Sequence, residues 1–448
     1  MKPGRLFRLK IGESGAEYDV SLNAMRRRLA SGIGAVVLGL VAIVFAQMGD
    51  LAQHLFLQFD KRWPYATLVT TPLLFAGVVH FTNLWCAEAK GSGIPQIIAA
   101  TKDPPRMAVG PLLSLRTSIG KTVMTLVMLL AGGSVGREGP TVQLSAAIMV
   151  AFHRMLQVPM TAGVLIAGGA AGVAAAFNTP LAGVAFAIEE LAAAFEQRVT
   201  VLVMAAVVIS GLVSLGFAGD YVYFGAMHET LSVTSVLIIT PVAGILGGLT
   251  GGIFSRVLLT ALRPGKSWLR RTKKHPVLLA AACGLIVAVI GTLTAGATWG
   301  TGYEPTKLLI EGEGASPWFG PAKFVATLAT AVSGAPGGIF APSLSVGAGL
   351  GQLLSFAFPD DPMGAVVLLG MMGYFVGVVR APLTAVIILM ETTASRGMIL
   401  PLFATALIAD LVSALVCREK LYHGLSRAFL PEPEKKPDEE SSSPPAQA

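Results

Sequence analysis

Three short segments of the chain combine glycines with a proline at the point where a helix would begin. They are GSGIP (residues 91–95), GREGP (residues 136–140) and GGIFAP (residues 337–342), and an apolar run follows each. Proline is favoured at the first position of a helix because the N–H that it lacks would have no partner there. Helix N-termini present unpaired N–H groups and partial positive charge, so three that meet would form an anion site without a buried lysine. Each segment alone could equally be an ordinary helix start.

Glu138 lies in the first turn of the helix expected after GREGP, in a stretch with very little charge. It could simply stabilise the helix start or pair with Arg137, since negative charge is favourable at a helix N-terminus. The functional interpretation is that the ionised carboxylate occupies the anion site in place of an anion and swings away when it is protonated. Glu138 would then be both a gate and a proton carrier.

Glu189 and Glu190 end the apolar run that begins at Pro180. A helix C-terminus repels negative charge, so two carboxylates there indicate access to water or a functional task. Glu391 repeats the position of Glu189 in a later segment, which favours a structural role for Glu189 and Glu391. Lys121, in the apolar run before Glu138, could add positive potential to an anion pathway or extend to a membrane surface.

The composition places these residues in a membrane. Of the 448 residues, 53% are apolar and 13% are charged, which is about half the charged fraction of a soluble domain. Gly139–Ile188 spans 50 residues with one charge and Phe324–Pro359 spans 36 with none, whereas one crossing needs about 20 apolar residues. The 51 glycines and 27 prolines lie within the apolar runs, which predicts short, broken and closely packed helices. Carboxylates inside a membrane are costly and usually functional, which favours the gate interpretation of Glu138.

The sequence contains an internal repeat with a constant offset of 202 residues. The matched residues are Gly136 with Gly338, Pro140 with Pro342, Gly168 with Gly370, Pro180 with Pro382, Leu181 with Leu383, and Glu189 with Glu391. The same offset carries the first membrane segment, about residues 31–54, onto residues 233–256. The first copy begins beside a basic stretch and the second ends beside one, so the copies cross the membrane in opposite directions. We predict an all-α polytopic membrane protein of two inverted-topology repeats of mostly tilted and broken helices, a design that binds its substrate near the membrane midplane.

Basic residues predict the topology. Seven lie before the first apolar run and seven lie between Arg256 and Lys274, and by the positive-inside rule both segments and the C-terminal end are cytoplasmic. We therefore expect a multi-pass protein of the cell inner membrane with both termini in the cytoplasm. The predicted organisation is a cytoplasmic N-terminal helix (1–30), a first membrane repeat (31–220), a second membrane repeat (230–416), a C-terminal helix (417–430) and a disordered tail (431–448) rich in proline, serine and charge.

The ordered motifs resemble those of a known family. GSGIP, GREGP and GGIFAP are joined by AAAFNTPLAGVAFAIEE (residues 174–190) and by the tyrosine of KLYHG (residues 420–424). This set resembles the CLC family of chloride channels and chloride/proton exchangers, in its bacterial type without a cytoplasmic regulatory domain. The resemblance covers residues 31–430 and implies a homodimer with one independent anion pathway in each subunit.

The resemblance also implies roles for individual residues. The hydroxyls of Ser92 and Tyr422 and the backbone N–H groups of Ile339 and Phe340 would hold the central chloride, and Glu138 would be the external gating glutamate. Each hydroxyl can donate a hydrogen bond to an anion without placing a charge in the membrane. Taken alone, Ser92 could instead cap its own helix, and Tyr422 could belong to an interfacial aromatic belt.

Glu190, the second glutamate of the IEE motif, would by the same resemblance collect protons from the cytoplasm, although it could also be a hydrated helix end. Two departures from the family concern this proton path. Gln96 follows GSGIP where the family often has glutamate, and Ile98 stands where some exchangers have another acidic residue near the internal proton site. The inner part of the proton path can therefore differ in this chain.

We predict a chloride/proton antiporter, with a passive voltage- or pH-gated chloride channel of the same fold as the alternative. Glu190 argues against the channel. An intramembrane hydrolase would need a nucleophile with a base or a set of metal ligands, whereas the six histidines are isolated in sequence and no HExxH motif occurs. We expect no enzyme activity, cofactor, metal or nucleic-acid partner; the expected partners are chloride, protons, the lipid bilayer and a second copy of the chain. Cys86, Cys283 and Cys417 are far apart and are expected to be packing residues.

Overall fold

The chain folds into α-helices joined by short 3₁₀ and π-helical segments. The computed structural model describes residues 6–63, 65–191, 197–219, 222–263 and 274–430, and within these ranges it contains no β-strand. The all-α fold predicted from the sequence is confirmed. The tail predicted at residues 431–448 lies outside the described residues.

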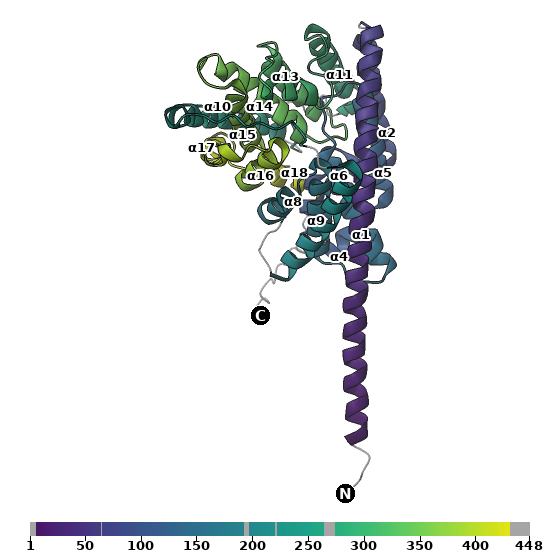
Figure 1. Cartoon of the computed structure of the whole chain (residues 1–448). Coiled ribbons are helices and arrows are strands. Elements are labelled where there is room, and N and C mark those ends of the chain that lie inside the picture. The colour runs from purple at the N-terminus through teal and green to yellow at the C-terminus, as the bar shows by residue number, and fades with distance from the viewer. Residues whose placement is uncertain (1–5, 64, 192–196, 220–221, 264–273, 431–448) are drawn as a thin grey trace, which may run out of the picture.

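The first helix, α1 (Leu6–Arg62), is continuous and lies along one edge of the molecule, and its N-terminal part extends well beyond the other helices (Figure 1). The boundary expected at residue 30 is therefore not a break in the helix. The physical reason is that no proline occurs between Pro3 and Pro64, so nothing interrupts the helical hydrogen bonds. The stretch Ala24–Arg62 is long and apolar enough to cross a membrane.

The helices of the first half recur in the same order in the second half. The first set is α2 (Thr67–Trp85), α3 (Ile94–Ala100), α5 (Leu115–Leu130), α6 (Glu138–Met155), α7 (Ala162–Phe177), α8 (Pro180–Phe186) and α9 (Gln197–Ala218). The corresponding set is α11 (Pro276–Leu293), α12 (Tyr303–Ile310), α13 (Phe319–Val332), α14 (Phe340–Ser355), α15 (Met363–Val379), α16 (Pro382–Thr393) and α17 (Ile399–Val416). The starts of α6, α8 and α9 are each 202 residues before those of α14, α16 and α17, the same offset that the sequence repeat has. Outside these pairs, α10 (Val233–Leu262) opens the second half, α4 (Pro104–Val109) follows α3, and α18 (Leu421–Ser426) ends the fold.

Corresponding residues of the two halves bind each other. The Gly136 N–H donates to the Gly338 carbonyl at 2.7 Å, and the Gly338 N–H donates to the Gly136 carbonyl at 2.8 Å. Such a reciprocal exchange between equivalent residues is what a two-fold relation produces. The halves therefore meet around a pseudo-two-fold axis beside this glycine pair, as the inverted repeat predicts.

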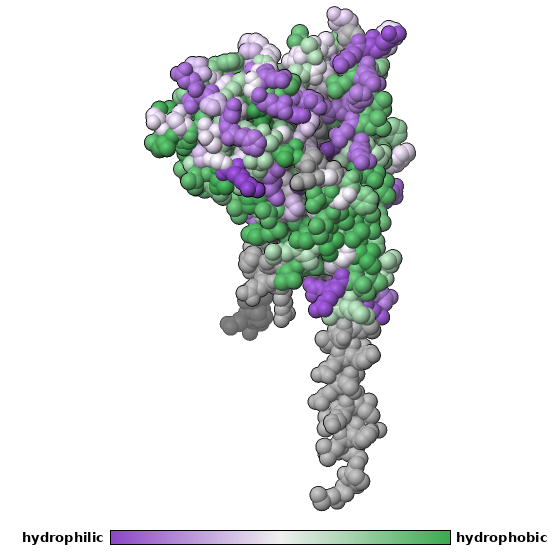
Figure 2. Space-filling view, viewed as in Figure 1, coloured by the Kyte–Doolittle hydropathy of each residue, from purple (hydrophilic) through white to green (hydrophobic). Residues whose placement is uncertain are grey.

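Most of the central helices are too short to cross a membrane alone. Five described helices are long and apolar enough, namely those at Ala24–Arg62, Thr67–Trp85, Val233–Leu262, Pro276–Leu293 and Arg396–Val416. Helices α7 and α14 are shorter, with 16 residues each, and nearly all of their residues are buried among neighbouring helices. Figure 2 shows hydrophobic residues over the lower body, with hydrophilic residues gathered in the upper part of the view and at the lower edge, as expected of a membrane protein.

Glycines allow the central helices to pack at very short distances. The core helix α15 is buried from Gly364 to Val379. A Cβ on Gly247 of α10 would lie 2.2 Å from the backbone of Gly373, and a Cβ on Gly370 would lie 2.4 Å from the backbone of α14. Small residues at such crossings let backbones approach closely, which is a main source of helix association in membranes. The three cysteines are buried and unpaired, as expected of packing residues.

Candidate functional site

Backbone contacts hold the three glycine- and proline-containing segments together. The Gly337 N–H donates to the Gly91 carbonyl at 3.2 Å, which links GGIFAP to GSGIP, and the reciprocal glycine pair links GGIFAP to GREGP. A Cβ on Gly139 would lie 2.3 Å from Oγ of Ser92, so GREGP and GSGIP also touch. The starts of α3, α6 and α14 therefore meet at one point inside the protein.

Ser92 lies in a tight turn that only glycine neighbours permit. Gly91 has a φ of 66° and Gly93 a φ of 115°, in the region that side chains rarely adopt. The turn makes Gly93 the residue before α3, with no side-chain cap, so the alternative in which Ser92 caps its own helix is wrong. The Ser92 hydroxyl is buried and has no hydrogen-bond partner among the described residues. It is therefore available to a ligand.

The start of α14 presents backbone N–H groups to the same point. Ile339 is the residue before the helix and Phe340 is its first residue, and the first N–H groups of a helix have no partner within it. The ring of Phe340 contacts four aromatic rings with centroid distances from 5.1 to 6.3 Å, those of Phe177, Phe186, Phe375 and Tyr422. This packing fixes the helix start relative to Tyr422.

Tyr422 is fully buried in α18, and its hydroxyl has no hydrogen-bond partner among the described residues. Burial rules out a position in an interfacial belt. Ser92, Ile339 and Tyr422 line one cavity of about 40 Å³ together with Gly338. A water needs about 10 to 15 Å³, so this cavity has room for a monatomic ion. Two unpartnered hydroxyls and a helix N-terminus face a space of that size.

Glu138 is the first residue of α6, and its side chain is fully buried. Its Oε2 accepts a hydrogen bond from the Ala341 N–H, in the first turn of α14, at 3.4 Å, while Oε1 has no partner among the described residues. A Cβ on Gly136 would lie 2.1 Å from Oε2, so the carboxylate can fold over this residue only because it is glycine. The carboxylate lies where the N-terminus of α14 would attract an anion, which is the position that the gate interpretation requires.

Arg137 does not pair with the neighbouring Glu138. Its guanidinium instead binds the Asp50 carboxylate at 2.7 Å and the Ala46 carbonyl at 2.5 Å, both on α1. Arg137 and Asp50 line an open cavity of about 360 Å³ beside the C-terminal half of α1. This cavity brings solvent close to the side of GREGP on which the Glu138 gate would open.

A second open cavity, of about 510 Å³, shares Ser92 and Gly91 with the small cavity. Its lining includes three basic side chains, Lys90, Arg263 and Arg427. Basic residues around a concave site raise the local concentration of anions. Open cavities thus lie on both sides of the meeting point of the helix starts.

Two buried lysines hold the loops of this region. The Lys121 amine is fully buried and donates to the Gly91 carbonyl at 3.0 Å, so it does not extend to a membrane surface. Lys323 is also fully buried and donates to the carbonyls of Thr298 and Gly300 at 2.9 and 2.7 Å. Lys323 was not predicted, although the repeat offset of 202 leads from Lys121 directly to it. Lys121 supports the turn that carries Ser92, in addition to any effect on potential.

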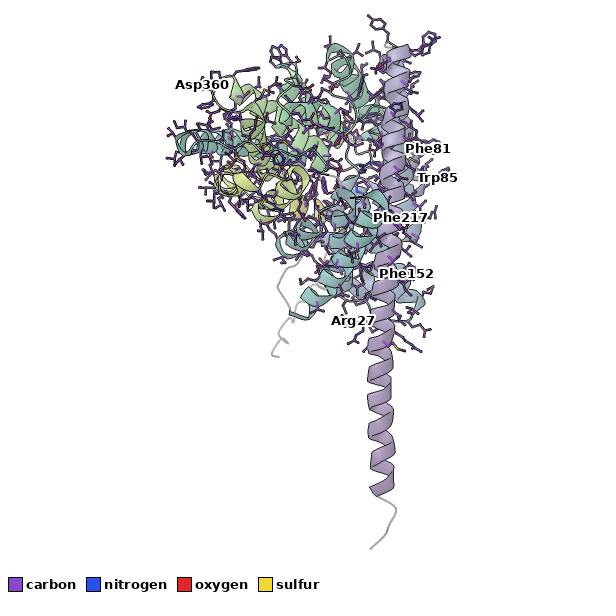
Figure 3. All side chains as sticks on the ribbon, in the orientation of Figure 1. Arg27, Phe81, Trp85, Phe152, Phe217 and Asp360 are labelled. Atoms are coloured by element: carbon purple, nitrogen blue, oxygen red, sulfur yellow. The ribbon has the colours of Figure 1, made fainter. Side chains whose placement is uncertain are left out.

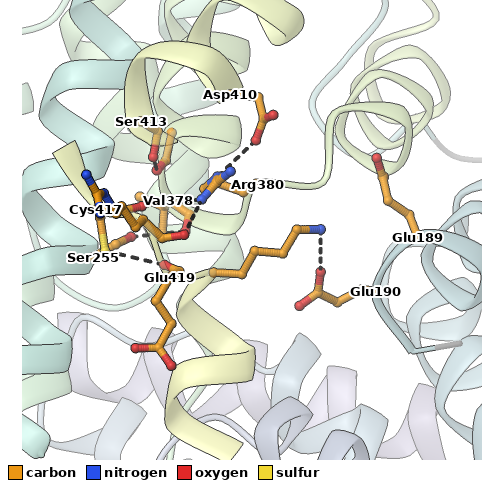
Figure 4. Close-up of polar contacts among 12 residues, drawn as sticks. Glu189, Glu190, Ser255, Val378, Arg380, Asp410, Ser413, Cys417 and Glu419 are labelled. Carbon is orange, nitrogen blue, oxygen red and sulfur yellow. Dashed lines mark hydrogen bonds and ion pairs between the residues drawn. The ribbon is translucent and has the colours of Figure 1, made fainter. Parts of the chain in front are cut away.

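Glu189 and Glu190 lie in a π-helical segment, Ala187–Leu191, and point in different directions (Figure 4). Glu189 accepts hydrogen bonds from the N–H groups of Leu383 and Thr384 at the start of α16, at 3.1 and 2.8 Å. Glu391 does the same at the start of α8, from Leu181 and Ala182 at 3.2 and 2.8 Å. The structural role predicted for Glu189 and Glu391 is thus reciprocal helix capping.

Glu190 is fully buried and turns toward α18. Its carboxylate lies 3.9 Å from the Lys420 amine (Figure 4) and 3.3 Å from Nδ1 of His423. Glu190 is therefore not a freely hydrated helix end. His423 was missed in the sequence, where its position beside Tyr422 in KLYHG was the available signal.

The residues at the two departures from the family motif, Gln96 and Ile98, have structural roles in this protein. Gln96 is fully buried, and its amide donates to the carbonyls of Glu88 and Lys90 at 3.1 and 2.7 Å. Ile98 belongs to the hydrophobic core. Neither residue can take up a proton, so α3 offers no titratable group at these positions.

These features define a class of protein: a polytopic helical membrane protein of two inverted repeats whose helix N-termini meet at a small internal cavity. The chain belongs to the voltage gated chloride channel family, whose model matches residues 73–414.

Curated relatives and solved structures agree with this assignment. The chain is 30% identical over 387 residues to the H(+)/Cl(-) exchange transporter ClcA of Salmonella agona, covering 83% of this chain and 80% of the relative. It is 29% identical over 448 residues to ClcA of Salmonella arizonae, covering 94% and 91%. Its fold is similar to a slow cyanobacterial Cl-/H+ antiporter, with a TM-score of 0.75, 23% identity and coverage of 90% and 98%. It is also similar to a CLC-type fluoride/proton antiporter, with a TM-score of 0.73, 21% identity and coverage of 88% and 96%.

Proposed function

We propose that the protein exchanges chloride for protons across the membrane. The relatives named as H(+)/Cl(-) exchange transporters, each matched over most of its length, support this activity. The observation that carries the proposal is the position of Glu138. Its buried carboxylate accepts a hydrogen bond from the first turn of α14, a place that also suits an anion. Because the carboxylate and an anion compete for one place, the movement of the proton on Glu138 is coupled to the movement of the anion.

In this proposal, chloride binds between the hydroxyls of Ser92 and Tyr422 and the N–H groups of Ile339 and Phe340. Support comes from the two unpartnered buried hydroxyls and the shared cavity. Glu138 gates the side that faces the Arg137 cavity. When Glu138 is ionised, its carboxylate blocks the chloride site. When Glu138 is protonated, the side chain leaves the site with its proton, and chloride enters.

Glu190 carries the proton on the opposite side of Glu138. Glu190 is fully buried, does not line the small cavity and lies against Lys420 and His423, which supports a proton route separate from the chloride route on that side. A passive channel would need no buried carboxylate of this kind. The passive channel stays the second candidate because the same anion site would serve it.

We also propose the topology. The protein lies in the inner membrane with both termini in the cytoplasm, as the basic residues before the first apolar run and those between Arg256 and Lys274 indicate by the positive-inside rule. Arg27 lies near the lower edge of the helical body and Asp360 near its upper edge (Figure 3), and this topology puts Arg27 on the cytoplasmic side. Residues 1–30, 31–220, 230–416 and 417–430 serve as N-terminal helix, first repeat, second repeat and C-terminal helix.

The assembly is proposed to be a homodimer that meets on the face of α8 and α16. Leu181, Ile188 and Leu383 there are 65, 41 and 38% exposed. The capping carboxylates of Glu189 and Glu391 are only partly buried beside this apolar face. Carboxylates open to lipid are unfavourable, so a second copy that covers this face would remove the cost.

Transport by purified protein in liposomes tests the function. A chloride gradient should drive protons uphill, recorded as a pH change outside the vesicles that a protonophore abolishes. Chloride movement without proton movement would contradict the exchanger and favour the channel. Vesicles with the Glu138→Gln variant serve as the uncoupled control.

A further inference from the structure

The buried carboxylate of Glu190 lies next to a histidine side chain that is partly exposed to solvent. The Glu190 side chain is 0% exposed, and Nδ1 of His423 lies 3.3 Å from its Oε1. The His423 side chain is 44% exposed, so water reaches the imidazole whose Nδ1 lies beside the carboxylate. Imidazole is the side chain that most readily takes up and releases protons near neutral pH.

Among the described residues, positions 96 and 98 of α3 offer no other carrier of this type. On α3, which packs against α18, Gln96 and Ile98 are a buried amide and a core residue. The Lys420 amine lies 3.9 Å from Oε2 of Glu190, where its charge stabilises the ionised carboxylate between transfers.

We propose that His423 passes protons between the cytoplasmic solvent and Glu190, an inference that rests on the proton exchange proposed above. A proton from water binds Nε2 of the neutral imidazole that already carries a proton on Nδ1. The imidazolium gives its Nδ1 proton to Oε1 of Glu190 and remains as the neutral Nε2–H form. Loss of the Nε2 proton to water and uptake of a proton from water at Nδ1 restore the first tautomer, so each cycle takes one net proton from water and passes one to Glu190.

Other charged side chains lie near the contact between His423 and Glu190. Glu189 is adjacent to Glu190 but points toward the start of α16. Glu419 forms ion pairs with Arg427, at 2.9 Å, and with Arg263. Glu419 is thus paired with two arginines, and among the described residues the charged groups placed against the Glu190 carboxylate are Lys420 and His423.

The test compares proton transport by His423→Gln and wild-type protein in liposomes under a chloride gradient, with equal starting pH on both sides, from about pH 5 to 8. We expect His423→Gln to slow proton movement by about ten-fold near neutral pH, since a positioned acid–base group is lost. Chloride binding measured by calorimetry should be unchanged, which shows that the variant is folded. His275→Gln, at an exposed histidine before α11, is the matched control and should keep the wild-type rate and pH profile.

A second variant separates proton transfer from a structural role. His423→Glu restores a titratable group that releases its proton at lower pH, so proton movement should return with its profile displaced to lower pH. If His423→Gln has the wild-type rate and profile, or if His423→Glu behaves like His423→Gln, the role of His423 is refuted. Wild-type protein that moves no protons would overturn the exchange itself, which is a different result.

Discussion

At the scale of single residues, the gate role proposed for Glu138 would let one side chain couple the movements of two ions. The N-terminus of α14 attracts negative charge, and the carboxylate reaches it across Gly136. Protonation removes the charge and with it the attraction. The same helix end can then receive chloride, so the occupancy of the site depends on the proton.

We predict that Glu138→Gln abolishes proton coupling and leaves anion flux insensitive to pH. Glutamine keeps the shape of the side chain but cannot ionise. In the wild type, flux should rise as the pH falls, because protonation frees the site. Glu304→Gln, which removes an exposed carboxylate from the outer cavity, should keep the wild-type pH dependence. Coupled proton transport by Glu138→Gln would refute the gate.

Ser92→Ala and Tyr422→Phe should each weaken chloride binding without unfolding the protein. Both hydroxyls are buried without a partner in the part of the chain that the structure describes. A hydrogen bond to a charged group is worth about 1.5 to 3 kcal/mol, so each change should raise the Kd roughly ten-fold or more. Calorimetric titration with chloride measures this. Unchanged affinity in the double variant would remove both side chains from the site.

At the scale of elements, the broken helices depend on caps supplied by the other half of the molecule. The N-terminus of α8 is capped by Glu391 and that of α16 by Glu189. Helix α8 has only seven residues, and the N–H groups of its first turn have no hydrogen-bond partner inside the helix. The two halves therefore complete each other's helices.

Glu189→Ala and Glu391→Ala should each lower thermal stability by a similar amount, equivalent to about 0.5 to 2 kcal/mol for a lost helix cap. Proton coupling should persist in both, in contrast to Glu190→Gln. Thermal unfolding in detergent and the liposome assay measure the two properties. Glu313→Ala, at an exposed position, is the control. A loss of coupling with unchanged stability would mean that Glu189 or Glu391, and not only Glu190, carries protons.

At the scale of the whole molecule, each subunit contains a full set of proposed site residues. The proposed dimer would therefore cover the face of α8 and α16 and would not be needed to complete the site.

Leu181→Trp combined with Leu383→Trp should convert the dimer to a monomer that still transports chloride. Both residues are exposed on the proposed interface, where a larger ring prevents close contact. Subunit counting in membranes by single-molecule photobleaching gives the assembly, and liposome flux gives the activity. Leu73→Trp on α2, which is also 65% exposed, is the control. A dimer that survives the double change would place the interface elsewhere.

The sequence by itself determined the membrane class, the helical fold and the inverted repeat. Hydropathy, glycine and proline act locally, so long apolar runs and three helix starts can be recognised without knowing what they touch. The constant offset of 202 residues likewise needs only the order of residues. Glu138 could be singled out as a candidate gate because its helix start and its charge-poor surroundings are both local features.

Only the tertiary structure decided the partners of the charged side chains. Arg137 binds Asp50 on α1 and not its neighbour Glu138. Glu189 and Glu190, adjacent in sequence, reach α16 and His423 respectively. Such pairings join residues far apart in the chain, and their geometry depends on how helices pack. Local patterns therefore showed where charge is unusual, while the packing of the helices decided which groups each charge meets.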